Sequence, residues 1–218
     1  MSAAGGLSAL RRFSRAAGGA ATEWCDGCRA TLASQHEHRL LLRGSSADRK
    51  LECVCVACAA ADGVGSPWKR VPRRCAPVRD LDAADVEWEA LGVPIRLAFF
   101  VVTGEGARPL AFFPSPAGAI ELAPSEDAWN RMQAKSAAVR RMEPDVEALL
   151  VHHARGEGAG ERGASGATVG HQYVVSIDVC YHLVGLVRAH WRGFEGGPQV
   201  WKRIDALLAD LRREANDA

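Results

Sequence analysis

Four cysteines near the N-terminus have the type and spacing of metal ligands. Cys25 and Cys28 form one Cys-x-x-Cys turn, and Cys55 and Cys58 form a second. Structural zinc sites take four such ligands at tetrahedral corners, whereas catalytic zinc sites keep one position open for water or substrate. The two turns therefore predict one structural zinc ion, held by protein ligands alone, and argue against a zinc hydrolase.

Three neighbouring residues are alternative ligands. Cys53 would lie on the same strand face as Cys55 and could replace it, or remain as a nearby thiol. His36 and His38 also alternate onto one face, although a solvated histidine pair explains them without a metal. We keep Cys53 and His38 as alternates outside the principal set.

Iron is the alternative metal, because a rubredoxin-like site uses the same paired knuckles and ligand softness does not separate the two ions. The residues that follow Cys28 and Cys58 are Arg29 and Ala59. Rubredoxin-like knuckles usually have glycine there, which favours zinc. An iron site, or Cys53 beside it, would make the protein a redox protein.

A second group of reactive residue types lies in one predicted helix: Asp178, Cys180 and His190. A nucleophilic cysteine–histidine pair is unfavourable, because ten residues of helix separate Cys180 from His190 by roughly 15 Å. We interpret Asp178 as a helix cap, Cys180 as a small buried hydrophobic residue and His190 as a cation in the last turn. An enzyme that uses this region remains an alternative.

We call the turn Cys25–Cys28 the first knuckle and the turn Cys55–Cys58 the second knuckle. A β-hairpin is expected to bring the two knuckles together. Its strands are a stretch around 38–43 and a return strand from Lys50, joined by a turn at 44–46. We predict a flexible arm at 1–22, a zinc-ribbon-like unit at 23–60, a Pro/Arg-rich connector at 61–80 and a body at 81–218. Pro67, Pro72 and Pro77 are expected to prevent regular structure in the connector.

The body has the pattern of an antiparallel sheet with a few packed helices, so the predicted class is α+β. Its expected elements are a hairpin of 95–102 and 110–113, a helix after Ser125, a strand or helix at 146–151, a flexible glycine-rich loop at 154–170, a strand at 173–177, and helices that begin at Asp178 and Pro198.

Composition limits the partners and the compartment. The 218 residues contain 27 Lys and Arg against 26 Asp and Glu, a net charge of +1, so no strong field favours nucleic acid or a membrane surface. No apolar run is long enough to span a bilayer. Five of seven cysteines crowd into 25–58, and residues 1–22 lack an export segment, so we expect a reducing, cytoplasmic compartment.

Six segments follow one another along the chain in a recognisable order: Leu10-Arg-Arg-Phe13, Cys53-Val-Cys-Val-Ala-Cys58, Ile95–Phe100, Phe112-Phe-Pro-Ser-Pro-Ala-Gly118, Glu143-Pro-Asp-Val-Glu-Ala-Leu-Leu150, and Asp178–Gly193 with His190-Trp-Arg-Gly193. Together they resemble a bacterial family of unknown function that is often encoded beside nickel-iron hydrogenase genes. The resemblance spans nearly the whole chain, with a longer stretch at 154–170. It implies an accessory role in hydrogenase assembly or maturation.

Such a role implies contact with another protein, either a hydrogenase subunit or a maturation factor. Aromatic and arginine side chains are favoured as anchors of protein interfaces. We expect the partner surface near the predicted helix 178–193, at Asp178, Arg188, His190, Trp191 and Arg192, and we expect a non-catalytic protein.

Overall fold

Two antiparallel sheets and five helices make up the part of the chain that the structure describes. This computed structural model describes residues 23–42, 49–63, 65–81, 96–104, 109–153, 170–193 and 196–217. The predicted arm at 1–22, the turn at 44–46 and nearly all of the loop at 154–170 lie outside these ranges. The predicted α+β class is confirmed.

The smaller sheet carries the cysteine knuckles. Its strands are β1 (Glu37–Leu41), β2 (Lys50–Val54) and β3 (Trp68–Val71), in the order β2-β1-β3. The predicted hairpin is confirmed as β1 and β2, which pair antiparallel with His38 opposite Cys53. The short helix α2 (Val56–Ala60) follows β2 and carries the second knuckle.

The segment 61–80 is not the irregular connector that its prolines predicted. It contains β3 and also β4 (Cys75–Pro77). Pro67 and Pro72 flank β3, while Pro77 ends β4, which is an edge strand of the larger sheet. Proline is tolerated at strand ends and sheet edges, where no backbone donor is needed. The prediction for this segment was wrong because its strands form only against distant partners.

The larger sheet has six strands in the order β4-β9-β8-β5-β6-β7. The predicted hairpin of the body is confirmed as β5 and β6, and the ambiguous segment 146–151 forms a strand. β7 was not predicted. The strands are β5 (Leu97–Val102), β6 (Pro109–Ser115), β7 (Gly118–Leu122), β8 (Glu147–His153) and β9 (Gly170–Ser176).

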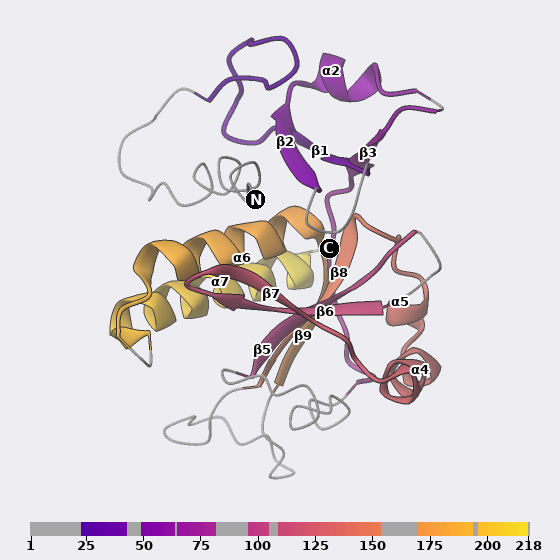
Figure 1. The fold of residues 1–218 in the computed structure, drawn as a ribbon, viewed down its shortest axis with the longest axis vertical. Helices are drawn as coiled ribbons and strands as arrows, with labels where there is room; N and C mark the ends of the chain where they lie inside the picture. The colour runs from indigo at the N-terminus through magenta and orange to yellow at the C-terminus, as the bar shows by residue number, and fades with distance from the viewer. Residues whose placement is uncertain are drawn as a thin grey trace, which may run out of the picture.

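Helices cover both faces of the larger sheet (Figure 1). On one face α6 (Ile177–His190) and α7 (Gly197–Asp217) pack on alternate residues of β5, β8 and β9. On the other face α4 (Glu126–Lys135) and α5 (Ala137–Arg140) pack on the remaining alternate residues. A strand covered on both faces is apolar without alternation, which explains the run at 97–101. No helix in the described ranges has the length and apolar character of a membrane span.

Serines occupy the N-cap positions of α4, α5 and α6. Ser125 Oγ accepts a hydrogen bond from the Ala128 amide, which confirms the predicted start of α4. Ser176 occupies the N-cap position of α6, two residues before Asp178. Asp178 is therefore a residue of the first helical turn rather than the cap, and its carboxylate is turned toward the smaller sheet.

The smaller sheet packs directly on the body. Leu40, Leu51 and Val71 belong to the same hydrophobic core as α6, α7 and one face of the larger sheet. Ion pairs also join the two parts, among them Arg49–Asp145 at 2.6 Å, Lys69–Glu143 at 3.0 Å and Arg74–Glu147 at 3.0 Å. The knuckles are therefore mounted on the body through both apolar packing and charge.

Candidate metal centre

The four predicted cysteine ligands converge in the structure. One ligand atom from each of Cys25, Cys28, Cys55 and Cys58 lies within 4.8 Å of the other three. The sulfur atoms of Cys28 and Cys55 are 3.7 Å apart. A tetrahedral zinc ion with Zn–S bonds of about 2.3 Å requires sulfur atoms about 3.8 Å apart. The site therefore has room for such an ion with little rearrangement.

The first knuckle is held by its own backbone and by β2. The Cys25 amide donates to the Ala30 carbonyl at 2.7 Å, and the Arg29 amide donates back to the Cys25 carbonyl at 2.9 Å. Asp26 bridges to Cys53: its amide donates to the Cys53 carbonyl at 2.8 Å, and its carboxylate accepts the Cys53 amide at 3.0 Å. These bonds shape the turn and join it to β2.

Arg29 takes a left-handed backbone conformation, with φ 66°. Glycine adopts this conformation most easily, yet the turn closes with arginine. The absence of glycine after Cys28 therefore does not discriminate zinc from iron. Arg29 no longer supports the predicted preference for zinc.

The second knuckle is built by the start of α2. Cys55 is the N-cap of that helix, and its sulfur accepts the amide of Cys58 at 3.5 Å. The sulfur of Cys25 accepts the amides of Cys28 at 3.5 Å and Cys55 at 3.3 Å. Amide donors directed at sulfur stabilise thiolates and orient them toward a metal.

The pKa values of Cys25 and Cys58 are shifted in opposite directions. Burial raises the pKa of Cys25, but backbone amides of Cys55, Cys28 and Gly27 outweigh it and lower that pKa to about 6. Hydrogen bonding with the sulfur atoms of Cys25, Cys28 and Cys55 raises the pKa of Cys58 to about 12. Because like charges repel, four adjacent thiolates require a cation among them, and a bound divalent ion would displace the remaining protons.

Gly27 leaves space for the fourth ligand. A β-carbon at this position would lie 2.9 Å from the sulfur of Cys58. Real β-carbons do not approach a neighbour this closely, so any side chain here would push the second knuckle away. Gly27 was not among the predicted site residues, although its place inside the Cys-x-x-Cys turn was a usable signal.

The alternates Cys53 and His38 do not lie in this cluster. They group with His36 in a second cluster, whose three ligand atoms lie within 4.8 Å of one another. The prediction that Cys53 could replace Cys55 fails for a local reason. Strand β2 ends at Val54, so Cys55 already belongs to the turn into α2, and the side chains no longer share a face.

Asp178 is separated from the other predicted partner-surface residues by the length of α6. Its carboxylate lies 2.7 Å from Nδ1 of His38. Burial raises the pKa of Asp178, but hydrogen bonds from His38 and Ser176 and the His38 charge outweigh it and lower that pKa. Arg188, His190, Trp191 and Arg192 lie at the opposite end of the helix.

The residues of the enzyme alternative do not form a site. Cys180 is fully buried in the core of the body, and burial raises the pKa of its thiol well above the ordinary value. His190 is the last residue of α6. Burial and the charges of Arg203 and Arg192 lower the pKa of His190, which disfavours the predicted cation at this helix end.

Two buried carboxylates that sequence analysis quoted only as part of a motif prove to be anchors. Asp145 accepts Arg49 and the amide of Gly104, and Glu147 accepts Arg74 through both oxygens at 3.0 Å. Both acids belong to the segment Glu143–Leu150 that carries the family resemblance. Their apolar surroundings were the available signal, because a buried acid needs a partner.

Comparison with known proteins assigns a family and no activity. No curated protein and no solved structure matches the chain significantly. The sequence model of a family described as "Family of unknown function (DUF5947)" matches residues 24–215, a range that includes both knuckles, both sheets and nearly all of α7. The chain therefore belongs to this family of unknown function.

Proposed function

We propose that this protein is a zinc-binding, non-catalytic accessory protein of the cytoplasm that acts through contact with another protein. The observation that carries the proposal is the closed four-cysteine set, with sulfur atoms of Cys28 and Cys55 3.7 Å apart. Four thiolate ligands leave no coordination position for water or substrate, so the metal stabilises structure.

The proposed role of the metal is to fix the first knuckle and α2 onto the β1–β2 hairpin. That unit has a small core of Cys25, Val54 and Ala59, which is too small to hold the segment without a further constraint. The body would then present the surface for the partner. The family resemblance directs the choice of partner to a nickel-iron hydrogenase subunit or maturation factor.

The metal is tested on protein purified anaerobically, by metal analysis and visible absorption. We expect colourless protein that contains zinc, with one equivalent lost in both Cys25→Ser and Cys58→Ser. Cys75→Ser is the control, because Cys75 is buried elsewhere and donates to the Leu211 carbonyl, a bond that serine can keep. Coloured, redox-active iron would replace this proposal with electron transfer.

The partner role is tested in a strain that lacks the gene, by measuring hydrogenase activity after complementation. We expect reduced activity that wild-type protein restores and Arg192→Glu does not. Arg131→Glu is the control, because Arg131 is an exposed arginine on α4, which covers the opposite face of the larger sheet from α6. Unchanged hydrogenase activity in the deletion strain would refute the hydrogenase role.

A further inference from the structure

A second set of metal-ligating side chains lies between the smaller sheet and α6. His36, His38 and Cys53 each offer a ligand atom within 4.8 Å of the others. Cys53 is the cross-strand partner of His38, and the rings of His36 and His38 meet edge to face with centroids 4.8 Å apart. Strands β1 and β2, with the residue just before β1, therefore place three ligands close together.

Each histidine of this set has one ring nitrogen already engaged. Nδ1 of His36 lies 2.9 Å from the Ala33 carbonyl, which accepts a hydrogen bond from it. Nδ1 of His38 lies 2.7 Å from the Asp178 carboxylate. A proton on Nδ1 leaves Nε2 with the lone pair that binds metals, and carboxylate or carbonyl partners of this kind orient metal-bound imidazoles.

The other nitrogen of His36 is unsatisfied. Its Nε2 is buried and has no hydrogen-bond partner among the described residues, and the side chain is only 9% exposed. A buried polar atom without a partner costs free energy, and few occur in folded proteins. A metal ion bound by His36 Nε2 would remove this cost.

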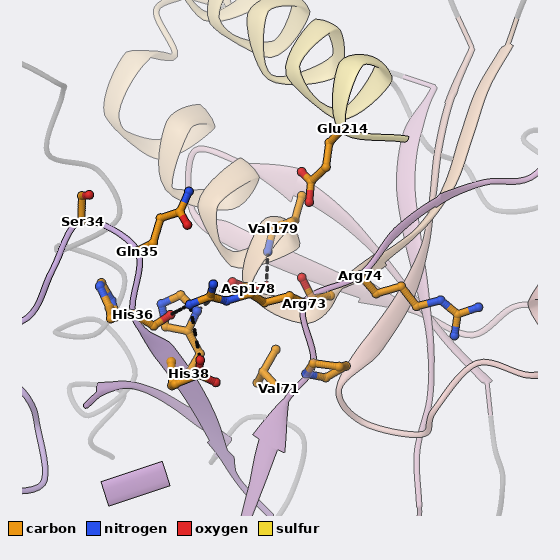
Figure 2. Close-up of a pocket in the computed structure, with 13 residues that line it drawn as sticks. Ser34, Gln35, His36, His38, Val71, Arg73, Arg74, Asp178, Val179 and Glu214 are labelled. Atoms are coloured by element: carbon orange, nitrogen blue, oxygen red, sulfur yellow. Dashed lines mark hydrogen bonds and ion pairs between the residues drawn. The ribbon is translucent and has the colours of Figure 1, made fainter. Parts of the chain in front are cut away.

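A pocket of about 330 Å³ borders the set. Figure 2 shows His36 and His38 on the β1 side of the pocket and Asp178 with Val179 at the start of α6. Cys53 is 7% exposed and lies opposite His38 on β2, outside the pocket lining. An ion held by these three ligands would thus have protein on one side and the pocket on the other.

We propose that His36, His38 and Cys53 bind a second transition-metal ion, of the zinc and cobalt class, with a coordination position open to the pocket. Imidazole and thiolate ligands select such ions over magnesium or calcium. Three protein ligands leave a fourth tetrahedral position for water or a small anion, in contrast to the closed four-cysteine site. Asp178 is a positioning residue that acts through His38.

The test uses full-length protein that keeps zinc in the four-cysteine site. Weakly held metal is removed with a mild chelator, and cobalt(II) is added under anaerobic conditions. We expect one equivalent of cobalt to bind without release of zinc, with one thiolate-to-cobalt charge-transfer band. Azide or imidazole should shift the visible cobalt bands, because the open position can accept either ligand.

Three variants identify the ligands. His36→Gln and Cys53→Ala should lose the equivalent of cobalt and the band. Gln35→Ala, which changes a neighbouring pocket residue outside the set, should keep both. Circular dichroism checks folding, and His36→Gln decides the question if Cys53→Ala does not fold.

Absence of cobalt binding, or unchanged binding in His36→Gln, would overturn the second site. Cobalt bands that neither azide nor imidazole shifts would overturn its open position. The proposal of a four-cysteine zinc site fails on a different result: purified protein would then contain no zinc that is lost in Cys25→Ser and Cys58→Ser.

Discussion

Gly27 and Cys58 lie so close that a β-carbon on residue 27 would stand 2.9 Å from the sulfur of Cys58. Gly27→Ala should therefore displace the fourth ligand and weaken zinc binding, at least tenfold by competition with a chromophoric chelator. Gly63→Ala is the matched control, because a β-carbon there meets nothing within 4 Å. Equal zinc affinity in the two variants would contradict the assigned role of Gly27.

Asp26 joins the first knuckle to β2 through hydrogen bonds in both directions with Cys53. Asp26→Ala removes the carboxylate that accepts the Cys53 amide, at an expected cost of about 1–3 kcal/mol in the free energy of unfolding. Asp26→Asn keeps an acceptor oxygen and should lose less than half of that amount. Urea unfolding of zinc-loaded protein measures both, and equal losses would show that the charge rather than the hydrogen bond is what matters.

The four-cysteine cluster was predictable because much of its information is local. Each Cys-x-x-Cys turn brings two sulfurs together whatever the rest of the fold does. The strands β3 and β4 were not predictable in the same way, because each forms only against a partner remote in sequence: β3 pairs with β1, and β4 pairs with β9. Proline content describes a segment alone and cannot report such pairing.

The alternation of side chains between the two faces of a strand predicts their positions only within the strand, not beyond its end. The rings of His36 and His38 do meet, although His36 precedes β1, and alternation failed for Cys53 and Cys55 because β2 ends at Val54. The start of α6 shows the same effect: Ser176 begins the helix two residues before the acid expected to cap it. Asp178 is thereby free to meet His38.

The buried Glu147 at the start of β8 forms an ion pair with Arg74, whose side chain is 33% exposed, in the segment that follows β3. Glu147 is 3% exposed, so Arg74→Ala leaves a buried carboxylate without its cation, at an expected cost of about 2–4 kcal/mol. The double variant Arg74→Met/Glu147→Leu should recover at least half of this loss, because it leaves no unpaired charge. Chemical unfolding of all three proteins tests the expectation, which fails if the double variant is as unstable as Arg74→Ala.

Cys180 and Cys75 should be unreactive in the folded protein. Burial raises the pKa of Cys180 well above the ordinary value, and burial with the Glu214 charge raises that of Cys75 to about 11. Thiolates rather than thiols react with iodoacetamide, so labelling at pH 8 should be about 100-fold or more slower than in urea. Peptide mass spectrometry reads out each site. If iodoacetamide labelled Cys180 in the folded protein as fast as a free cysteine, the result would support an enzyme that uses this region.

His152 should make the protein less stable in mild acid. Burial, followed by the charges of His171 and His153, lowers the pKa of His152 from 6.5 to about 4. Below pH 6.5 the unfolded chain therefore binds a proton that the folded protein does not. The contribution of His152 to stability is complete above pH 6.5 and is lost as the pH falls toward 4, by about 2–3 kcal/mol in total.

The comparison that isolates this effect is wild type against His152→Gln, measured by urea unfolding between pH 7 and pH 4.5. Glutamine has a similar polar character and does not titrate, so the variant should lose less stability than wild type over the same range. Both proteins carry the same cysteine site, so acid-driven release of metal affects them equally and cancels in the difference. The difference in unfolding free energy between the two proteins could instead stay constant with pH. His152 would then be protonated as readily in the folded protein as in the unfolded chain. In that case the burial of its ring at the β8–β9 pairing would contribute nothing to acid sensitivity.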